Sequence, residues 1–554
     1  MKSTVWKKGR HVTIAAALTM SVALTGCSKD NNGGSASTDA TTNANASTNQ
    51  TTHTNDAAAD KNVEITFMDW SNRDNNEGKD YDYAFDEYMK QHPNVTIKRI
   101  YQPLADGGYD KLLDTQFVSH KAPDVMKLFG PNITKYTDQG YIARLDGYMK
   151  QPTPYNDNKV WVDTFVNGEK ALRGLKAQNK FGSISFVPVD AGPGQNPLMP
   201  FYYNKDLLDK AGVTEIPKTW AEFIEACKKL KESGVVPVTV DNERFLNWIN
   251  SWVGSELGEG YLNTFFDKKY ESKDLYEDKV LAAVMLGKIG KDDPVVNSAL
   301  DIVKDFSQYW QEGWAGNTYD QSQQLFLLGK AAFILDGNWF YNFYKETITD
   351  FKFGLMPFPL ITQETSQYAA GGMPVGGDQV TYGWGINADA EKDPDKMKVI
   401  IDIFQYLTSK EVQAKMSEIG VWAPVTADVA VPADLKAFLS TEDNKFEQTL
   451  DNPVYNMASD GMPLSQEWLL GQSTKDEYLD KIVKDGIKNT TQRAKDALDP
   501  NIGIQNQIKT LQEALDKQKA DGAADVVIKA AEESLGLAQL KLEFYKQYIE
   551  PAMK

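Results

Sequence analysis

The sequence predicts an α/β fold with more than one domain and a helical C-terminal part. The chain has 554 residues, which is more than a single hydrophobic core usually supports. Strand-like and helix-like segments alternate between Val63 and Gln139, and helical periodicity dominates from about Ala390 onward. Strand–helix alternation is typical of right-handed βαβ units, so we expect a mainly parallel sheet.

The elements of the first βαβ region are predicted from the spacing of its apolar residues. Alternating apolar residues predict strands, and apolar residues three and four apart predict helices. The expected helices end at His92-Pro93 and at Gly140, which are typical stop signals. In chain order the predicted elements are strand Val63–Phe67, helix Tyr81–Met89, strand Val95–Ile100, helix Tyr109–Phe117, strand Ala122–Leu128 and helix Ile133–Gln139.

The pattern resumes after Phe201. Two capping boxes predict helix starts, one at Thr219 and Glu222 and the other at Thr408 and Glu411. Cys227 shares an apolar helical face after the first box, so we expect a buried thiol. Two more strands are predicted at Ala332–Leu335 and Thr381–Ile386. A helical hairpin, broken near Gly522, is predicted at Ile504–Met553.

The N-terminus has the features of a secretion signal. A basic stretch precedes the apolar run Val12–Leu24, which is shorter than the about 20 residues that a membrane-spanning helix needs. The run ends in Leu24-Thr25-Gly26-Cys27, which resembles a bacterial lipobox. That resemblance implies a lipoprotein signal peptide over residues 1–26 and a lipid, such as palmitate, on Cys27.

A polar segment follows the signal. Residues 27–61 are mostly Ser, Thr, Asn, Ala, Asp and Gly, which bury too little apolar surface to offset the entropy of ordering. We expect a flexible tether that lifts a folded body, starting near Asn62, off the membrane. The expected location is therefore the cell membrane, lipid-anchored, facing the extracellular or periplasmic side.

Charge and residue counts argue against several function classes. The formal net charge of -18 opposes binding to nucleic acid phosphates. Only four histidines occur, and only His92 and His120 follow the tether, so a zinc site or a Ser-His-Asp triad is poorly supported. We expect no catalytic residues, no metal and no cofactor.

Aromatic and amide residues point to a carbohydrate ligand. The chain has 12 Trp and 25 Tyr. Sugars have apolar C–H faces and a rim of hydroxyls, so their sites need aromatic rings beside polar groups. Three segments combine the two, namely Asp69–Asp74, Asn247-Trp248 and Asp336–Trp339.

These segments occur in an order that resembles a known family. Between about Val63 and Lys495 the chain is similar to the extracellular solute-binding proteins of bacterial carbohydrate importers, family 1, which include the maltose-binding protein. The landmarks that carry the resemblance are Ala122–Val125, Tyr202–Leu208, Ile216–Trp220, Leu328–Phe333, Gly337–Trp339 and Leu407–Gln413.

The resemblance implies a class II, two-lobe periplasmic-binding-protein-like fold with an interlobe ligand cleft. Lobe 1 is expected from 62–190 and 331–388, and lobe 2 from 191–330 and 389–554, including a C-terminal helical hairpin at 504–553. It also implies an ABC transporter permease as partner, hinge closure around the ligand and a monomer that is not an enzyme.

The family's ligand contacts transfer to this chain by position. The expected contacts are Trp70, Arg73, Asp74, Asp124, Lys127, Asn132, Phe245, Asn247, Trp248, Asp336, Trp339, Tyr341, Gly372, Trp384 and Trp468. The loop after Asp124 departs from the family, because Leu128, Pro131 and Asn132 stand where the family has a Trp and an Asp–Arg pair. That departure argues against maltose itself.

Three alternatives stay open at this point. A surface polysaccharide hydrolase or lyase would use a carboxylate pair, and carboxylates are plentiful. A sensor or adhesin would use the same fold to present a ligand-dependent face to another protein. The same fold also carries peptides, polyamines and metals, so a non-sugar ligand is a further alternative.

Overall fold

The computed structural model describes most of the chain after the predicted tether. The described residues are 61–71, 78–104, 108–172, 179, 181–190, 200–242, 244–258, 260–375, 380, 382–435, 445–447, 461–520 and 525–554, and they belong to one compact unit. The calls on the signal peptide, the lipidated Cys27 and the tether lie outside these residues, apart from Lys61. Among the described residues, no helix combines the length and the apolar character needed to cross a membrane.

The first sheet has four strands in the order β2-β1-β3-β9. β1 is parallel to β2 and β3, and β9 is antiparallel to β3. The mainly parallel sheet predicted from the sequence is therefore confirmed for this part. The strands are β1 Val63–Asp69, β2 Val95–Tyr101, β3 Val125–Phe129 and β9 Tyr382–Ile386.

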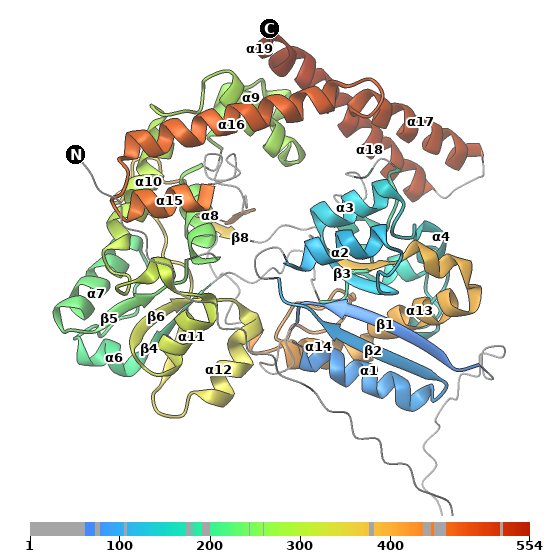
Figure 1. Cartoon of the computed structure of the whole chain (residues 1–554), viewed down its shortest axis with the longest axis horizontal. Coiled ribbons are helices and arrows are strands. Elements are labelled where there is room, and N and C mark those ends of the chain that lie inside the picture. Colours follow the sequence, from blue (N-terminus) through green and yellow to red (C-terminus); the bar gives the residue numbers. More distant parts are fainter. Residues whose placement is uncertain are drawn as a thin grey trace, which may run out of the picture. The chain divides into compact units, whose positions relative to one another are not determined.

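Helices from both ends of the sequence pack around the first sheet. α13 lies against β1 although more than 300 residues separate them, as Figure 1 shows by the orange helix beside the blue strand. Their contact includes Phe67 and Phe404, whose ring centroids are 5.9 Å apart. The helices are α1 Lys79–Gln91, α2 Gly108–Val118, α3 Gly130–Gln139, α4 Asp146–Met149, α13 Pro394–Leu407 and α14 Lys410–Gly420.

The second sheet has the order β5-β6-β4-β7. Only β5 and β6 are parallel, while β4 pairs antiparallel with both β6 and β7. The strands are β4 Phe201–Asn204, β5 Val236–Thr239, β6 Ala331–Leu335 and β7 Phe353–Met356. A further pair, β8 Met373–Val375 with β10 Lys445–Glu447, is parallel.

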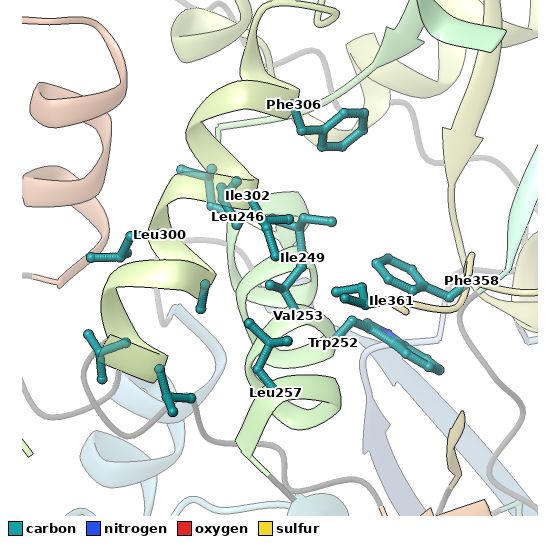
Figure 2. Packing of buried hydrophobic residues seen from close by; sticks show 14 of the residues in the cluster. Leu246, Ile249, Trp252, Val253, Leu257, Leu300, Ile302, Phe306, Phe358 and Ile361 are labelled. Atoms are coloured by element: carbon teal, nitrogen blue, oxygen red, sulfur yellow. The ribbon is translucent and has the colours of Figure 1, made fainter. Parts of the chain in front are cut away.

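The core of the second part is built on amphipathic helices. The Thr219 capping box of α7 is confirmed, and Cys227 is buried on its inner face as expected. Figure 2 shows Trp252 of α8 pointing toward Phe358, with the two rings stacked at 5.0 Å. The helices are α6 Lys205–Lys210, α7 Trp220–Glu232, α8 Arg244–Gly258, α9 Tyr276–Met285, α10 Pro294–Ser307, α11 Tyr319–Leu327 and α12 Tyr341–Thr347.

The two parts differ from the expected lobe boundaries. Residues 331–356 were expected in lobe 1, but β6 and β7 hydrogen-bond within the second sheet, and Phe333 of β6 lies in the second core. Residues 389–420 were expected in lobe 2, but α13 and α14 pack on the first core. The second and third crossovers thus come later in the chain than expected, because strand pairing places β6 and β7 in the second sheet and apolar packing places α13 and α14 on the first core.

The second predicted capping box is wrong. α14 begins one residue later, with Ser409 as its N-cap and its side-chain oxygen accepting from the Val412 amide. Thr408 instead ends α13, and its hydroxyl donates to the Phe404 carbonyl at 2.8 Å. Two helices that follow each other almost directly leave Thr408 to satisfy a carbonyl of the first helix.

The C-terminal helices form the predicted hairpin and add a longer helix before it. α17 and α18 pack on each other around a small core of Leu511, Leu515, Leu535 and Ala538. The helices are α15 Gly461–Leu469, α16 Lys475–Leu498, α17 Ile504–Ala520, α18 Asp525–Phe544, the π-helical turn η12 Tyr545–Ile549 and α19 Glu550–Ala552.

The segments before and after the hairpin both contact the same helix, α9. Arg493 of α16 forms an ion pair with Glu277 of α9 at 2.8 Å. Asp278, the next residue of α9, accepts from Tyr545 at 2.7 Å and pairs with Lys541 at 3.1 Å. Arg493 and the segment from Lys541 to Tyr545 therefore contact adjacent residues of α9.

Candidate functional site

A first aromatic cluster forms where the strands of the first sheet end. We define it as Trp70, Phe129 and Tyr382. Trp70 follows β1, and Phe129 ends β3 opposite Tyr382 in the register with β9. Trp70 and Phe129 stack with centroids 4.5 Å apart and planes 11° from parallel. Ligands of open α/β sheets bind at the carboxyl ends of parallel strands, which is where this cluster lies.

A buried lysine lies among these rings. The Lys127 Nζ is 5.1 Å from the centroid of Trp70 and 5.3 Å from those of Tyr81 and Tyr382. It forms an ion pair with Asp190 and donates to Ser71 Oγ at 3.3 Å. The Asp190 Oδ1 has no hydrogen-bond partner within the part of the chain that the structure describes. That oxygen is itself buried within this network.

A network of buried charges holds the start of the loop after β1. Arg99 donates to Asp69 at 2.7 and 3.0 Å and to Asp82 at 3.1 Å. It also donates to the carbonyls of Gly78 at 2.6 Å and Ser71 at 2.9 Å. Because one guanidinium ties both ends of the loop, Trp70 is held in place at its base.

A buried carboxyl lies next to this network. Asp80 accepts from the Trp422 indole at 2.7 Å and from the backbone amide of Tyr81 at 2.8 Å. Burial, and then the nearby charge of Asp190, raise the pKa of Asp80 to about 7, while Trp422 opposes the rise. This carboxyl therefore changes its charge near neutral pH.

A second aromatic cluster forms after β6 of the second sheet. We define it as Trp248, Tyr319 and Trp339, all of them half-buried. The Trp248 centroid is 6.0 Å from that of Tyr319 and 6.1 Å from that of Trp339, both edge to face. β6 is parallel to β5, so this cluster also lies near the carboxyl end of a parallel pair.

A comparison with protein families shows which family this chain belongs to. A profile described as bacterial extracellular solute-binding protein matches residues 73–414, which is more than half of the chain. The chain belongs to this family. The resemblance stated from the sequence is confirmed, and α15 to α19 lie beyond the matched region.

Two curated relatives of this solute-binding protein carry different descriptions. An uncharacterised ABC transporter extracellular-binding protein of Pyrococcus horikoshii is 25% identical over 50% of this chain and 57% of its own length. An sn-glycerol-3-phosphate-binding periplasmic protein of Rhizobium meliloti is 24% identical over 41% of this chain and 46% of its own length. The chain thus spans about half the length of these relatives.

Solved structures establish the fold of this solute-binding protein. A chitin oligosaccharide binding protein matches 77% of this chain and 99% of its own with a TM-score of 0.55 at 20% identity. A solute-binding protein in complex with raffinose matches 77% of this chain and 100% of its own, with a TM-score of 0.55 at 17% identity. The two-lobe α/β fold predicted from the sequence is confirmed.

Several predicted contacts of the solute-binding protein lie in its hydrophobic cores. Phe245 packs against Phe306 and Trp310, and Trp468 stacks on Tyr478 at 5.1 Å. Trp384 is fully buried, and its indole donates to the Tyr81 hydroxyl at 3.0 Å. These three rings are covered because large apolar side chains gain most from burial. They are therefore not part of the site proposed below.

The remaining predicted contacts have other surroundings. Asp124 accepts from Thr66 and pairs with Lys396 at 2.5 Å, and Asn132 donates to Asp110 at 2.7 Å. Tyr341 is half-buried against Phe353, and Gly372 is buried. Arg73, Asp74 and the side chain of Asn247 lie outside the described part of the chain.

Sequence reasoning did not name three residues of the two clusters, nor the Asp190 that pairs with Lys127 beside the first cluster. The three are Phe129, Tyr319 and Tyr382. Tyr319 had a usable signal, because the capping box of Thr318 and Gln321 places it at the first turn of a helix. Phe129 and Tyr382 come together through the pairing of β3 with β9, and Asp190 is brought to Lys127 from 63 residues away, so neither contact has a local signal.

An apolar pocket of this protein lies away from both clusters. It is lined by Gly254, Gly258, Tyr261, Leu262, Tyr276, Ile289, Val295, Val296 and Ala299. Such a lining offers few groups to hydrogen-bond a sugar's hydroxyls. Among the described residues, no group of three or more His, Cys, Asp or Glu is placed to hold a metal ion.

Proposed function

We propose that this protein is the lipid-anchored solute-binding subunit of an ABC importer and delivers an oligosaccharide to the permease unchanged. The observation that carries the proposal is the pair of aromatic clusters, each beside a buried polar network at the carboxyl end of a parallel strand. Flat rings suit the C–H faces of sugars, and fixed polar groups suit their hydroxyls. Chitin oligosaccharide and raffinose in the titles of similar structures support the same ligand class.

The lysine in the first cluster argues against a cationic ligand. Aromatic cages bind cations such as quaternary ammonium groups through the faces of the rings. Here the Lys127 ammonium already lies near three aromatic rings and is neutralised by Asp190. A polyamine would have to compete with this internal cation for the aromatic rings, whereas a neutral sugar would not.

A binding role also fits better than catalysis. The family consists of solute-binding receptors, and the described clusters contain rings and positioned polar groups in place of an opposed carboxylate pair. A glycosidase would need two carboxyl groups about 5–10 Å apart on either side of one glycosidic bond. The proposal therefore predicts affinity for the sugar without turnover.

Thermal unfolding tests the ligand class. Raffinose, chitotriose, maltotriose or xylotriose should raise the melting temperature of the purified protein, because a ligand at about 100 times its Kd stabilises by about 2.7 kcal/mol. The measurement is differential scanning fluorimetry, with sn-glycerol-3-phosphate and spermidine as comparison ligands. A shift with either of these and with none of the sugars would overturn the proposed class.

The lipid anchor is part of the proposal and rests on the lipobox before Cys27. Cys27→Ser removes the sulfur that would carry the lipid, so this variant should leave the membrane pellet for the soluble fraction. The measurement is an immunoblot of fractionated bacterial cells. Equal retention of Cys27→Ser and wild type in the membrane fraction would contradict lipid anchoring at this residue.

A further inference from the structure

The carboxylate under the second aromatic cluster has no free acceptor position. Asp336 is fully buried and was expected to contact the ligand. Its Oδ1 accepts from the Tyr319 hydroxyl and from the Gly337 amide at 2.8 Å. Its Oδ2 accepts from Tyr344 at 2.5 Å and from Gln323 at 3.0 Å. A carboxylate has about four lone-pair sites, so all of them are used inside the protein.

One of these four donors reaches the tryptophans. The Tyr319 hydroxyl donates to Asp336 and accepts from the Trp339 indole Nε1 at 3.4 Å. The Tyr319 ring also meets the Trp248 ring edge to face. Tyr319 is therefore the side chain that joins the buried carboxylate to both indoles of the cluster.

Trp339 also packs on a glycine. A Cβ on Gly337 would lie 2.3 Å from Cη2 of the Trp339 indole, so the ring rests directly on the glycine backbone. The Gly337 carbonyl is itself fixed by the Tyr202 hydroxyl at 2.8 Å. The indole thus contacts both a fixed backbone and the Tyr319 hydroxyl.

We infer that Tyr319, oriented by Asp336, is a positioning residue that presets Trp248 and Trp339 for a sugar ring. The effect of Tyr319 on binding rests on the proposed function. Asp336, which was expected to contact the ligand, instead supports the residue that orients the indoles. Rings that are held in their binding geometry before the ligand arrives lose less conformational entropy on binding. Tyr319 thereby sets the affinity that the two indoles provide.

Two phenylalanine variants test the inference. Tyr319→Phe and Tyr344→Phe each remove one hydroxyl from the same carboxylate, but Tyr344 is fully buried and has no ring contact with either indole. Titration calorimetry would use whichever of raffinose, chitotriose, maltotriose or xylotriose gives the largest thermal shift. We expect Tyr319→Phe to weaken binding about 3–10-fold, as loss of a preorganising hydrogen bond predicts, and Tyr344→Phe to leave it within twofold.

A second readout is independent of any sugar. The Trp339 indole N–H resonance, assigned with Trp339→Phe, should shift in the ¹⁵N spectrum of Tyr319→Phe and stay in place in Tyr344→Phe. Equal losses of affinity in both variants, or an unmoved indole resonance in Tyr319→Phe, would overturn the positioning role. If no sugar binds the wild type, the proposed function fails, and the indole resonance still decides whether Tyr319 holds the ring.

Discussion

Arg99→Met is expected to lower the free energy of unfolding by about 3–5 kcal/mol, the usual cost of removing one partner of a buried ion pair. The Arg99 and Asp69 side chains are 2% and 0% exposed, and two hydrogen bonds join them. Without the guanidinium, Asp69 stays buried without its charge partner, and the carbonyls of Gly78 and Ser71 lose a donor. Urea unfolding followed by circular dichroism measures the change.

The neighbouring residue on β2 provides the control. Lys98 pairs with Glu64 at 2.8 Å, but both side chains are more than half exposed. Lys98→Met should therefore change the unfolding free energy by less than about 1 kcal/mol. If Arg99→Met were as mild as Lys98→Met, the buried network would not be what stabilises the loop after β1.

Trp339→Ala is expected to weaken sugar binding about 10–100-fold, or about 1–3 kcal/mol, since it removes a stacking face and the apolar area buried with it. The indole is half-buried and follows β6 without belonging to the sheet, so the fold should survive. Titration calorimetry with the sugar that gives the largest thermal shift measures the loss, and circular dichroism checks the fold.

Trp468→Ala is the matched control for the loss of an indole. Trp468 is 5% exposed and stacks on Tyr478 in the second core. Its removal should lower the melting temperature and leave the affinity unchanged, the reverse of what is expected for Trp339→Ala. If Trp339→Ala unfolds while Trp468→Ala weakens binding, the two tryptophans have the opposite roles.

Local patterns predicted the first sheet well. The predicted strands overlap β1, β2 and β3, and β2 shows why, because its buried Val95 and Ile97 alternate with the exposed Thr96 and Lys98. Thr219 and Glu222 predicted a helix start correctly because a capping box is complete within four residues. These signals need no knowledge of distant parts of the chain.

Pairing and burial were harder to predict because they depend on distant residues. The segment at 332–335 was correctly expected to be a strand, but its neighbours β4 and β5 could not be read from its own residues. Trp339 lies two residues after Gly337 and Trp384 lies directly after Gly383, yet one is half-buried and the other is fully covered. Only the packing of other segments on each ring separates a candidate platform from a core residue.

The C-terminal hairpin has a consequence for how the molecule loses its structure. Ile504 at the start of α17 and Phe544 at the end of α18 are buried in the second core, whereas the middle of each helix packs on the other helix. Their own small core of four residues stabilises them far less than the large cores stabilise the rest. We therefore expect the amide protons around Leu515 and Leu535 to exchange with solvent by local opening before the whole protein unfolds.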